Sequence, residues 1–294
     1  MTLEPLRRSV MIRRWTSADI DYVSESVSRE GWGCTQRDVE RCWKLELNGC
    51  FIAEFQNKPV GHVFSIRYGK VGWIGLLIVN PERRGQGVGF ALMETAVDYL
   101  RRAGAETIRL EAVEEAVPLY RRLGFVEEFG SLRFRRQLRQ NKKTRFKRGR
   151  TLQMRDDDIA NVAQFDTPHF GANRLPVLQS LYKGHPQLCF VAKDRGKIVG
   201  YLMARQMQNG FWIGPWVCLN SQTARHLFNT LIRTIEEEDF ELRVGLPVLN
   251  TSGQGLMEKL GFQLVSKSIH MVQGNKGNQG AITNVYGIGG PEKG

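Results

Sequence analysis

Apolar and polar residues follow one another along the chain in a pattern that predicts a mixed α/β fold. The longest apolar run, Val71 to Val79, indicates a buried strand. After a short turn comes an amphipathic helix with Leu92, Ala96 and Leu100 on one side, and Gly104 marks its expected end. The full order predicted is a strand, two helices, a three-strand meander, a helix, a strand, a short helix and a final strand.

This order of elements is predicted twice, because short blocks of the sequence recur. The aligned blocks are residues 50–61 with 189–200 and 73–75 with 212–214, both at an offset of 139, and 123–125 with 260–262 at an offset of 137. Recurrence of several blocks in the same order indicates two copies of one fold. Chance similarity between hairpins is the alternative. A fourth block near the start, residues 19–20 with 158–159, argues against it, because all four blocks keep the same order.

The net charge of +12 is concentrated in one segment, residues 133–150. This segment holds ten of the 42 Lys and Arg residues and no acid, which leaves 32 basic against 30 acidic residues elsewhere. We interpret it as a strand with one buried face followed by a solvated linker, the alternative being a patch that binds RNA or an acidic partner. The predicted boundaries are a first domain at 1–138, a basic linker at 139–150 and a second domain at 151–294.

A glycine-rich turn joins the apolar strand to the amphipathic helix of the first copy. Its sequence is Arg83-Arg84-Gly85-Gln86-Gly87-Val88-Gly89. Glycines at such a turn let backbone N–H groups approach an anion, and the positive end of the helix and the arginines add favourable charge. A P-loop would need Lys and Ser/Thr after the last glycine, and a dinucleotide fingerprint would need glycine at Phe90. A purely structural turn is the remaining alternative.

The Arg84-x-x-Gly87-x-Gly89 spacing resembles motif A of the GNAT superfamily of N-acetyltransferases, and residues 118–125 resemble the motif that follows it. The resemblance implies two tandem GNAT-like domains, each a mixed, mostly antiparallel twisted sheet flanked by helices, with acetyl-CoA as cosubstrate. It implies that the backbone of Leu77, Ile78 and Val79 pairs with the pantetheine arm. The residues expected to form the pyrophosphate loop are Arg84, Gly85, Gln86, Gly87, Val88, Gly89 and Phe90.

Two side chains are candidates for proton transfer by the same resemblance. Tyr120 matches the tyrosine that protonates the leaving sulfur in many members, and Glu111 matches a glutamate that serves as base in relatives. A half-buried ring and a solvent-exposed carboxylate are the respective alternatives. Glu30 is a weaker candidate for the base. The loop at 113–117 is shorter than in many members and lacks their asparagine, which puts one cofactor contact in doubt.

The second copy differs from the first where the chemistry is expected. The offset of 139 places residues 223–228 opposite 84–89, with His226 and Phe228 at two of the glycine positions. A Cβ at these positions would fill the space that phosphate needs. The second domain is therefore expected to be a degenerate copy without the pyrophosphate loop.

The resemblance implies an N-acetyltransferase that acts on the primary amine of a small molecule by direct attack. The alternatives are a protein or peptide acetyltransferase, a non-catalytic acyl-CoA sensor and an RNA-associated module. Five scattered cysteines and five scattered histidines give no metal-ligand spacing, so no metal is expected. No apolar run is long enough to span a membrane, a cytoplasmic location is expected, nucleic acid is not an expected partner, and the internal repeat weakly favours a monomer.

Overall fold

The computed structural model describes residues 10–139, 151–278 and 280–294, and these fall into two compact units. Unit 1 comprises Met1–Glu127, Met271–Lys276 and Lys293, and unit 2 comprises Glu128–His270, Gly277–Glu292 and Gly294. Each unit is therefore discontinuous in sequence. Most of the predicted linker lies outside the described residues, and the sequence boundary at residue 138 stays a prediction.

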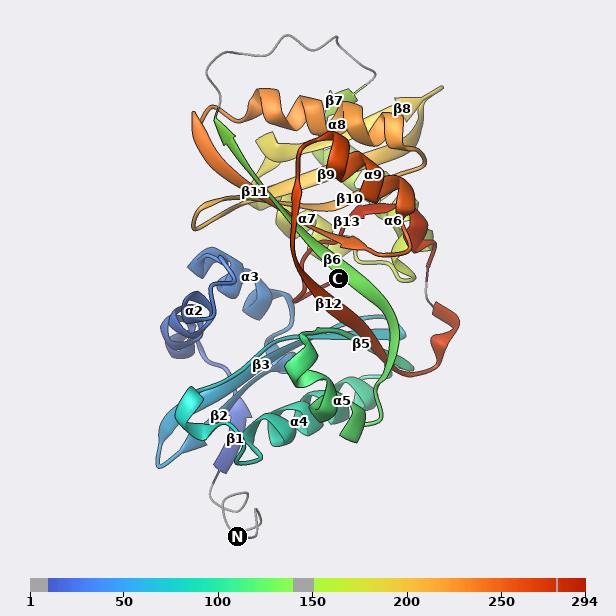
Figure 1. Cartoon of the computed structure of the whole chain (residues 1–294). Helices are drawn as coiled ribbons and strands as arrows, with labels where there is room; N and C mark the ends of the chain where they lie inside the picture. The colour runs from blue at the N-terminus through green and yellow to red at the C-terminus, as the bar shows by residue number, and fades with distance from the viewer. Residues whose placement is uncertain (1–9, 140–150, 279) are drawn as a thin grey trace. The chain divides into compact units, whose positions relative to one another are not determined.

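Unit 1 contains a sheet in which five strands lie side by side in chain order (Figure 1). These strands are β1 (Val10–Arg14), β2 (Cys50–Phe55), β3 (Lys58–Tyr68), β4 (Val71–Val79) and β5 (Thr107–Ala112). The pairs from β1 to β4 are antiparallel, whereas β4 and β5 are parallel. The last residues of β12 (Gln263–Gly274) complete the unit beside β5, so this strand, although it ends the second repeat, serves the first unit.

Four helices cover the sheet of unit 1, namely α2 (Ile20–Arg29), α3 (Gln36–Leu45), α4 (Val88–Arg102) and α5 (Val117–Arg122). Leu92, Ala96 and Leu100 of α4 are fully buried, as their spacing predicts. A Cβ added at Gly61 would lie 3.2 Å from Leu92 Cδ1, so α4 packs closely on the face of β3 to which Gly61 points. Because successive strand residues point to opposite faces, His62 faces away from α4.

Unit 2 repeats this architecture with its own strands and helices. Its strands are β6 (Val126–Arg139), β7 (Thr151–Gln153), β8 (Cys189–Asp194), β9 (Lys197–Met207), β10 (Gly210–Cys218), β11 (Asp239–Pro247), the first part of β12 and β13 (Val285–Gly287). Its helices are α6 (Ile159–Phe170), α7 (Leu175–Gly184), α8 (Ser221–Thr234) and α9 (Thr251–Lys259). The strand order is β12-β6-β11-β10-β9-β8-β7, and β13 pairs with β10 off this path.

The strand β6 carries the basic segment and one buried face, as predicted. Leu132 and Phe134 are each 7% exposed and belong to the hydrophobic core of unit 2. On the polar face, Arg135 lies 3.5 Å from Glu241, and Arg139 lies 3.6 Å from Asp239 of β11. This part of the basic segment therefore follows the interpretation of a strand with a solvated, charged face.

The predicted fold class is confirmed in both units, down to one shared detail. The parallel pair β4–β5 joins residues 71–74 to 107–110, and the parallel pair β10–β11 joins 211–213 to 242–244. The latter strands match the former through the repeat of Trp-Ile-Gly at 73–75 and 212–214. Each unit thus has one short parallel pair within a mainly antiparallel sheet.

Candidate active site

The strand β4 separates from β5 partway along its length. Among the described residues, the last pair of their ladder is Ile74 with Leu110. Beyond it, Leu76 adopts a left-handed backbone with φ of 49°, and two residues of β4 lie opposite one residue of β3. Such a β-bulge bends a strand and disrupts the ladder locally. The end of β4 that holds Leu77, Ile78 and Val79 therefore lies past its pairing with β5.

The glycine turn that follows β4 leads directly into helix α4. Gly85 and Gly87 have φ of 74° and 86°, values that favour glycine, and Gly87 is the N-cap residue without a side-chain cap. Ala91 N donates the first helical backbone hydrogen bond, to Gly87 O at 3.1 Å. The amides of Val88, Gly89 and Phe90 therefore precede the helical ladder at the positive end of α4.

The packing of Gly89 tests whether this turn is merely structural. A Cβ added there would lie 3.5 Å from Val79 Cγ2 and 3.6 Å from Leu119 Cδ2, which are ordinary contacts. Its φ is not in the left-handed range, so neither backbone conformation nor internal packing requires glycine. Neither of these two requirements therefore accounts for the glycine at residue 89.

Charged side chains surround the turn. Arg84 Nε donates to Val79 O at 2.9 Å, and the same guanidinium forms an ion pair with Glu30. Gln86 Nε2 donates to Glu82 O at 2.9 Å. Glu30, the weaker candidate for a base, is therefore engaged by an arginine of the turn.

Tyr120 lies on α5, the helix whose Leu119 is next to Gly89. Its side chain is 7% exposed and packs edge-on against Phe125 at a ring distance of 6.2 Å. Burial raises the pKa of Tyr120 to about 12, so the hydroxyl keeps its proton at neutral pH. The residue can therefore donate a proton, as an acid near a leaving thiolate must.

Glu111 lies on β5, one residue beyond Leu110 and thus beyond the last pair with β4. Its side chain is half-buried. Strand alternation places it on the same face of β5 as the buried Arg109. The structure thus places Glu111, the end of β4 and the glycine turn around the same divergence of strands, with Tyr120 on the helix that packs against that turn.

His62 on β3 is a buried polar residue beside this divergence that the sequence patterns did not single out. It pairs with Ile78 in the β3–β4 ladder and is 0% exposed. Its ring lies 5.8 Å from the ring of Trp15 and 6.1 Å from that of Tyr22. Among the described residues no hydrogen-bond partner is found for either ring nitrogen. The nearby backbone of Leu76 raises the pKa of His62 and partly offsets the effect of burial. A single histidine within an apolar strand gives no sequence signal of such a site.

The corresponding helix of unit 2 begins differently. Residues 223–228, which the repeat aligns with 84–89, already lie inside α8. Asn220 caps this helix, since its Oδ1 accepts a hydrogen bond from Thr223 N at 2.8 Å. The N-terminus of α8 therefore receives its acceptor from the protein's own side chain, whereas that of α4 does not.

Family models match both repeats of the chain. Residues 15–125 match a model described as the acetyltransferase (GNAT) family, and residues 162–287 match one described as an acetyltransferase (GNAT) domain. The chain is 23% identical to the holothin acyltransferase of Pseudoalteromonas sp. (strain SANK 73390) over 89% of each protein.

Solved structures share the fold over nearly the full length. A putative acetyltransferase from Pyrococcus horikoshii has a TM-score of 0.77 at 22% identity, covering 98% of this chain and 96% of that one. A tandem GNAT protein from the clavulanic acid biosynthesis pathway has a TM-score of 0.61 at 12% identity, covering 90% and 98%. These likenesses concern the fold.

The described residues give no support for a membrane-spanning helix, a metal site or a disulfide. Their helices include none that is long and apolar enough to cross a membrane. They also include no group of three or more His, Cys, Asp and Glu side chains placed to hold a metal ion, and the absence of a metal stays a prediction. All five cysteines are buried, and none of them forms a disulfide.

The variant Gly89→Ala separates a ligand role from a packing role. We expect stability to stay unchanged or rise by up to about 1 kcal/mol, because alanine favours a helix over glycine. We expect affinity for acetyl-CoA, measured by calorimetry, to fall about tenfold or more, equivalent to ~1.4 kcal/mol. The control is Gly255→Ala in α9, where an added Cβ meets nothing within 4 Å. Equal affinity of both variants and the wild type would exclude the turn as the binding site.

Burial of His62 makes stability depend on pH. Burial lowers its pKa to about 3 from an ordinary 6.5. Between these values the unfolded chain binds more protons than the folded one, so stability falls as the pH falls, by at most about 1.4 kcal/mol per pH unit. Urea unfolding from about pH 7.5 down to about pH 4.5 should show this loss in the wild type and a shallower one in His62→Leu. An identical slope in the wild type and in His62→Leu would refute the assignment.

Proposed function

Since the chain belongs to the GNAT family of acetyltransferases and carries two such domains in tandem, we propose that its first domain transfers an acetyl group from acetyl-CoA to the primary amine of a small molecule. Members of this family use acetyl-CoA. The observation that carries the proposal is the combination, in one unit, of an uncapped glycine turn with a strand that leaves its neighbour just before it.

The turn is the proposed site of the CoA diphosphate. Arg84, Gly85, Gln86, Gly87, Val88, Gly89 and Phe90 would hold it. The donors are the backbone amides that precede the ladder of α4, and the helix dipole adds to their attraction for an anion. The contacts of Gly89 support this role, because the space beside it is not needed by the protein itself.

The end of β4 is the proposed site of the pantetheine arm. An extended arm with amide groups can pair with a strand in the way another strand does. The backbone of Leu77, Ile78 and Val79 would supply this pairing, and a backbone N–H here would stabilise negative charge on the reacting carbonyl oxygen. The bulge at Leu76 supports the assignment, since it turns these residues away from β5.

Two side chains are proposed to move protons. Acetyl-CoA supplies a thioester whose carbonyl carbon a neutral amine can attack directly. Glu111 would accept the proton of the incoming amine, directly or through water, and Tyr120 would donate a proton to the departing sulfur. The Tyr120 hydroxyl is protonated at neutral pH, as the acid role requires, and the position of Glu111 beyond the last β4–β5 pair supports its access to the reacting groups.

The acceptor and the acyl group are the parts that the fold leaves open. A holothin acyltransferase among the relatives indicates that acyl transfer is carried out by a chain of this length and organisation. Thiol release from acetyl-CoA, followed with a panel of amino acids, amino sugars, polyamines and peptides, would identify the acceptor. Turnover with small amines supports the proposal, and turnover with peptides alone favours a protein acetyltransferase. Saturable acetyl-CoA binding without any turnover favours a sensor.

The variant Tyr120→Phe tests the acid. We expect kcat to fall by about 10²-fold, the lower end of general acid–base contributions, while the Kd of acetyl-CoA changes by less than about threefold. The control is Tyr99→Phe on α4, which removes a hydroxyl that donates to Glu46 Oε1 at 2.7 Å. This variant changes none of the proposed site residues. A kcat for Tyr120→Phe equal to that of the control would remove Tyr120 from the mechanism.

A further inference from the structure

In unit 2 the divergence between the parallel strands is filled by the chain itself. The strands β10 and β11 pair over Phe211–Ile213 and Leu242–Val244 and then separate, as β4 and β5 do. Beyond this point β13 pairs with β10, with Trp216 opposite Gly287 and Val217 opposite Val285. On the other side, Ile288 N donates to Gly245 O of β11 at 2.9 Å. The segment 285–290 therefore bonds to both strands between which it lies.

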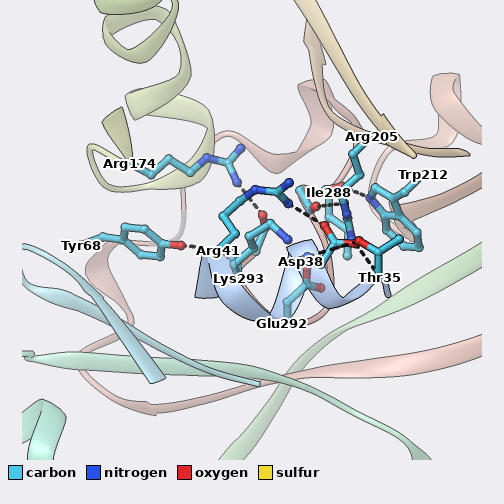
Figure 2. A network of polar contacts seen from close by, with 12 residues as sticks. Thr35, Asp38, Arg41, Tyr68, Arg174, Arg205, Trp212, Ile288, Glu292 and Lys293 are labelled. Atoms are coloured by element: carbon cyan, nitrogen blue, oxygen red, sulfur yellow. Dashed lines mark hydrogen bonds and ion pairs between the residues drawn. The ribbon is translucent and has the colours of Figure 1, made fainter. Parts of the chain in front are cut away.

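Side chains of unit 2 hold this segment from outside the ladder. Trp212 Nε1 donates to Ile288 O at 3.0 Å, and Asn250 Nδ2 donates to Val285 O at 2.9 Å. Arg205 donates to Gly289 O at 2.8 Å and lies 3.2 Å from Glu292 (Figure 2). Arg205 and Glu292 are 2% and 4% exposed, so this ion pair is buried. Removal of either partner would break this buried ion pair.

Glycines on both sides of the contact make room for the segment. A Cβ at Gly214 would lie 1.9 Å from Ile288 O, and one at Gly245 would lie 2.9 Å from Ile288 Cγ1. In the segment itself, a Cβ at Gly287 would lie 2.8 Å from Ile213 O. Close fit at three glycines indicates that the sequence of unit 2 is adapted to this occupant.

We infer that residues 285–290 are a resident ligand of the second domain, which take the backbone hydrogen bonds that an extended, amide-bearing arm is proposed to take in the first. The degenerate domain then keeps its polar strand edges satisfied without a cofactor. Together with the capped start of α8, this leaves one acyl-CoA site per chain. This last consequence rests on the proposed function, whereas the binding of the segment does not.

The test is Gly287→Ala, compared with Gly255→Ala as the matched control. The new Cβ at residue 287 meets the backbone of β10, so we expect the segment to detach more often. The backbone amides of residues 285–288, among them Ile288 N, which donates to Gly245 O, should then exchange with deuterium about tenfold faster or more, while acetyl-CoA binding stays within about twofold of the wild type. Unchanged exchange at these amides would overturn the inference.

A second experiment covers the case in which Gly287→Ala does not fold. The second variant is Trp212→Phe in the full chain, which removes the indole N–H that donates to Ile288 O. The backbone amides of residues 285–288 should exchange faster than in the wild type, because the segment loses one of its anchors. Exchange equal to that of the wild type would overturn the inference. Calorimetry on the full chain should give about one acetyl-CoA per chain, because residues 285–290 occupy the divergence of unit 2. Two per chain would contradict the resident ligand, whereas no binding would contradict only the proposed function.

Discussion

The separation of β4 from β5 is the constraint on which the candidate site depends. Strands paired along their whole length would use their backbone N–H and C=O groups in hydrogen bonds to each other. The left-handed turn at Leu76 ends that pairing after Ile74, so the rest of β4 can pair with a ligand instead. The glycine turn follows immediately, and it adds the free amides of a helix start to the same path. In the proposed function, these two sets of backbone donors would bind one elongated, anionic molecule with the help of few side chains.

The two units satisfy the same polar groups in different ways. In unit 2 the strand edges exposed by the divergence are paired with residues 285–288, and the start of α8 is capped by Asn220. In unit 1 the equivalent helix begins at glycine without a side-chain cap. Unsatisfied buried backbone groups are costly. Strands that separate in this way therefore need another group to pair with the strand edges that they expose. By the inference above, residues 285–290 take in unit 2 the place that the cofactor is proposed to take in unit 1.

Much of this architecture could be predicted from the sequence. Recurring blocks predicted the repeat, and the spacing of Leu92, Ala96 and Leu100 predicted the buried side of α4. The grouping of residues 128–139 with unit 2 and of 271–276 with unit 1 could not be predicted, because strand alternation specifies which face is buried and not which strand lies next to it. The insertion of residues 285–290 between β10 and β11 could not be predicted either, because a short glycine-rich segment has no hydrophobic periodicity. His62 was missed because one histidine in an apolar strand resembles any core position.

Hydrogen exchange of the full chain with and without acetyl-CoA tests the central claim most directly. Backbone amides that hydrogen-bond to the ligand become protected from exchange. The position of each protected peptide in the sequence identifies the unit that binds acetyl-CoA. The account predicts protection across residues 75–90, at the end of β4 and the start of α4, and no change across 214–228. Protection across 214–228, or exchange across 75–90 that is unaffected by saturating acetyl-CoA, would contradict it.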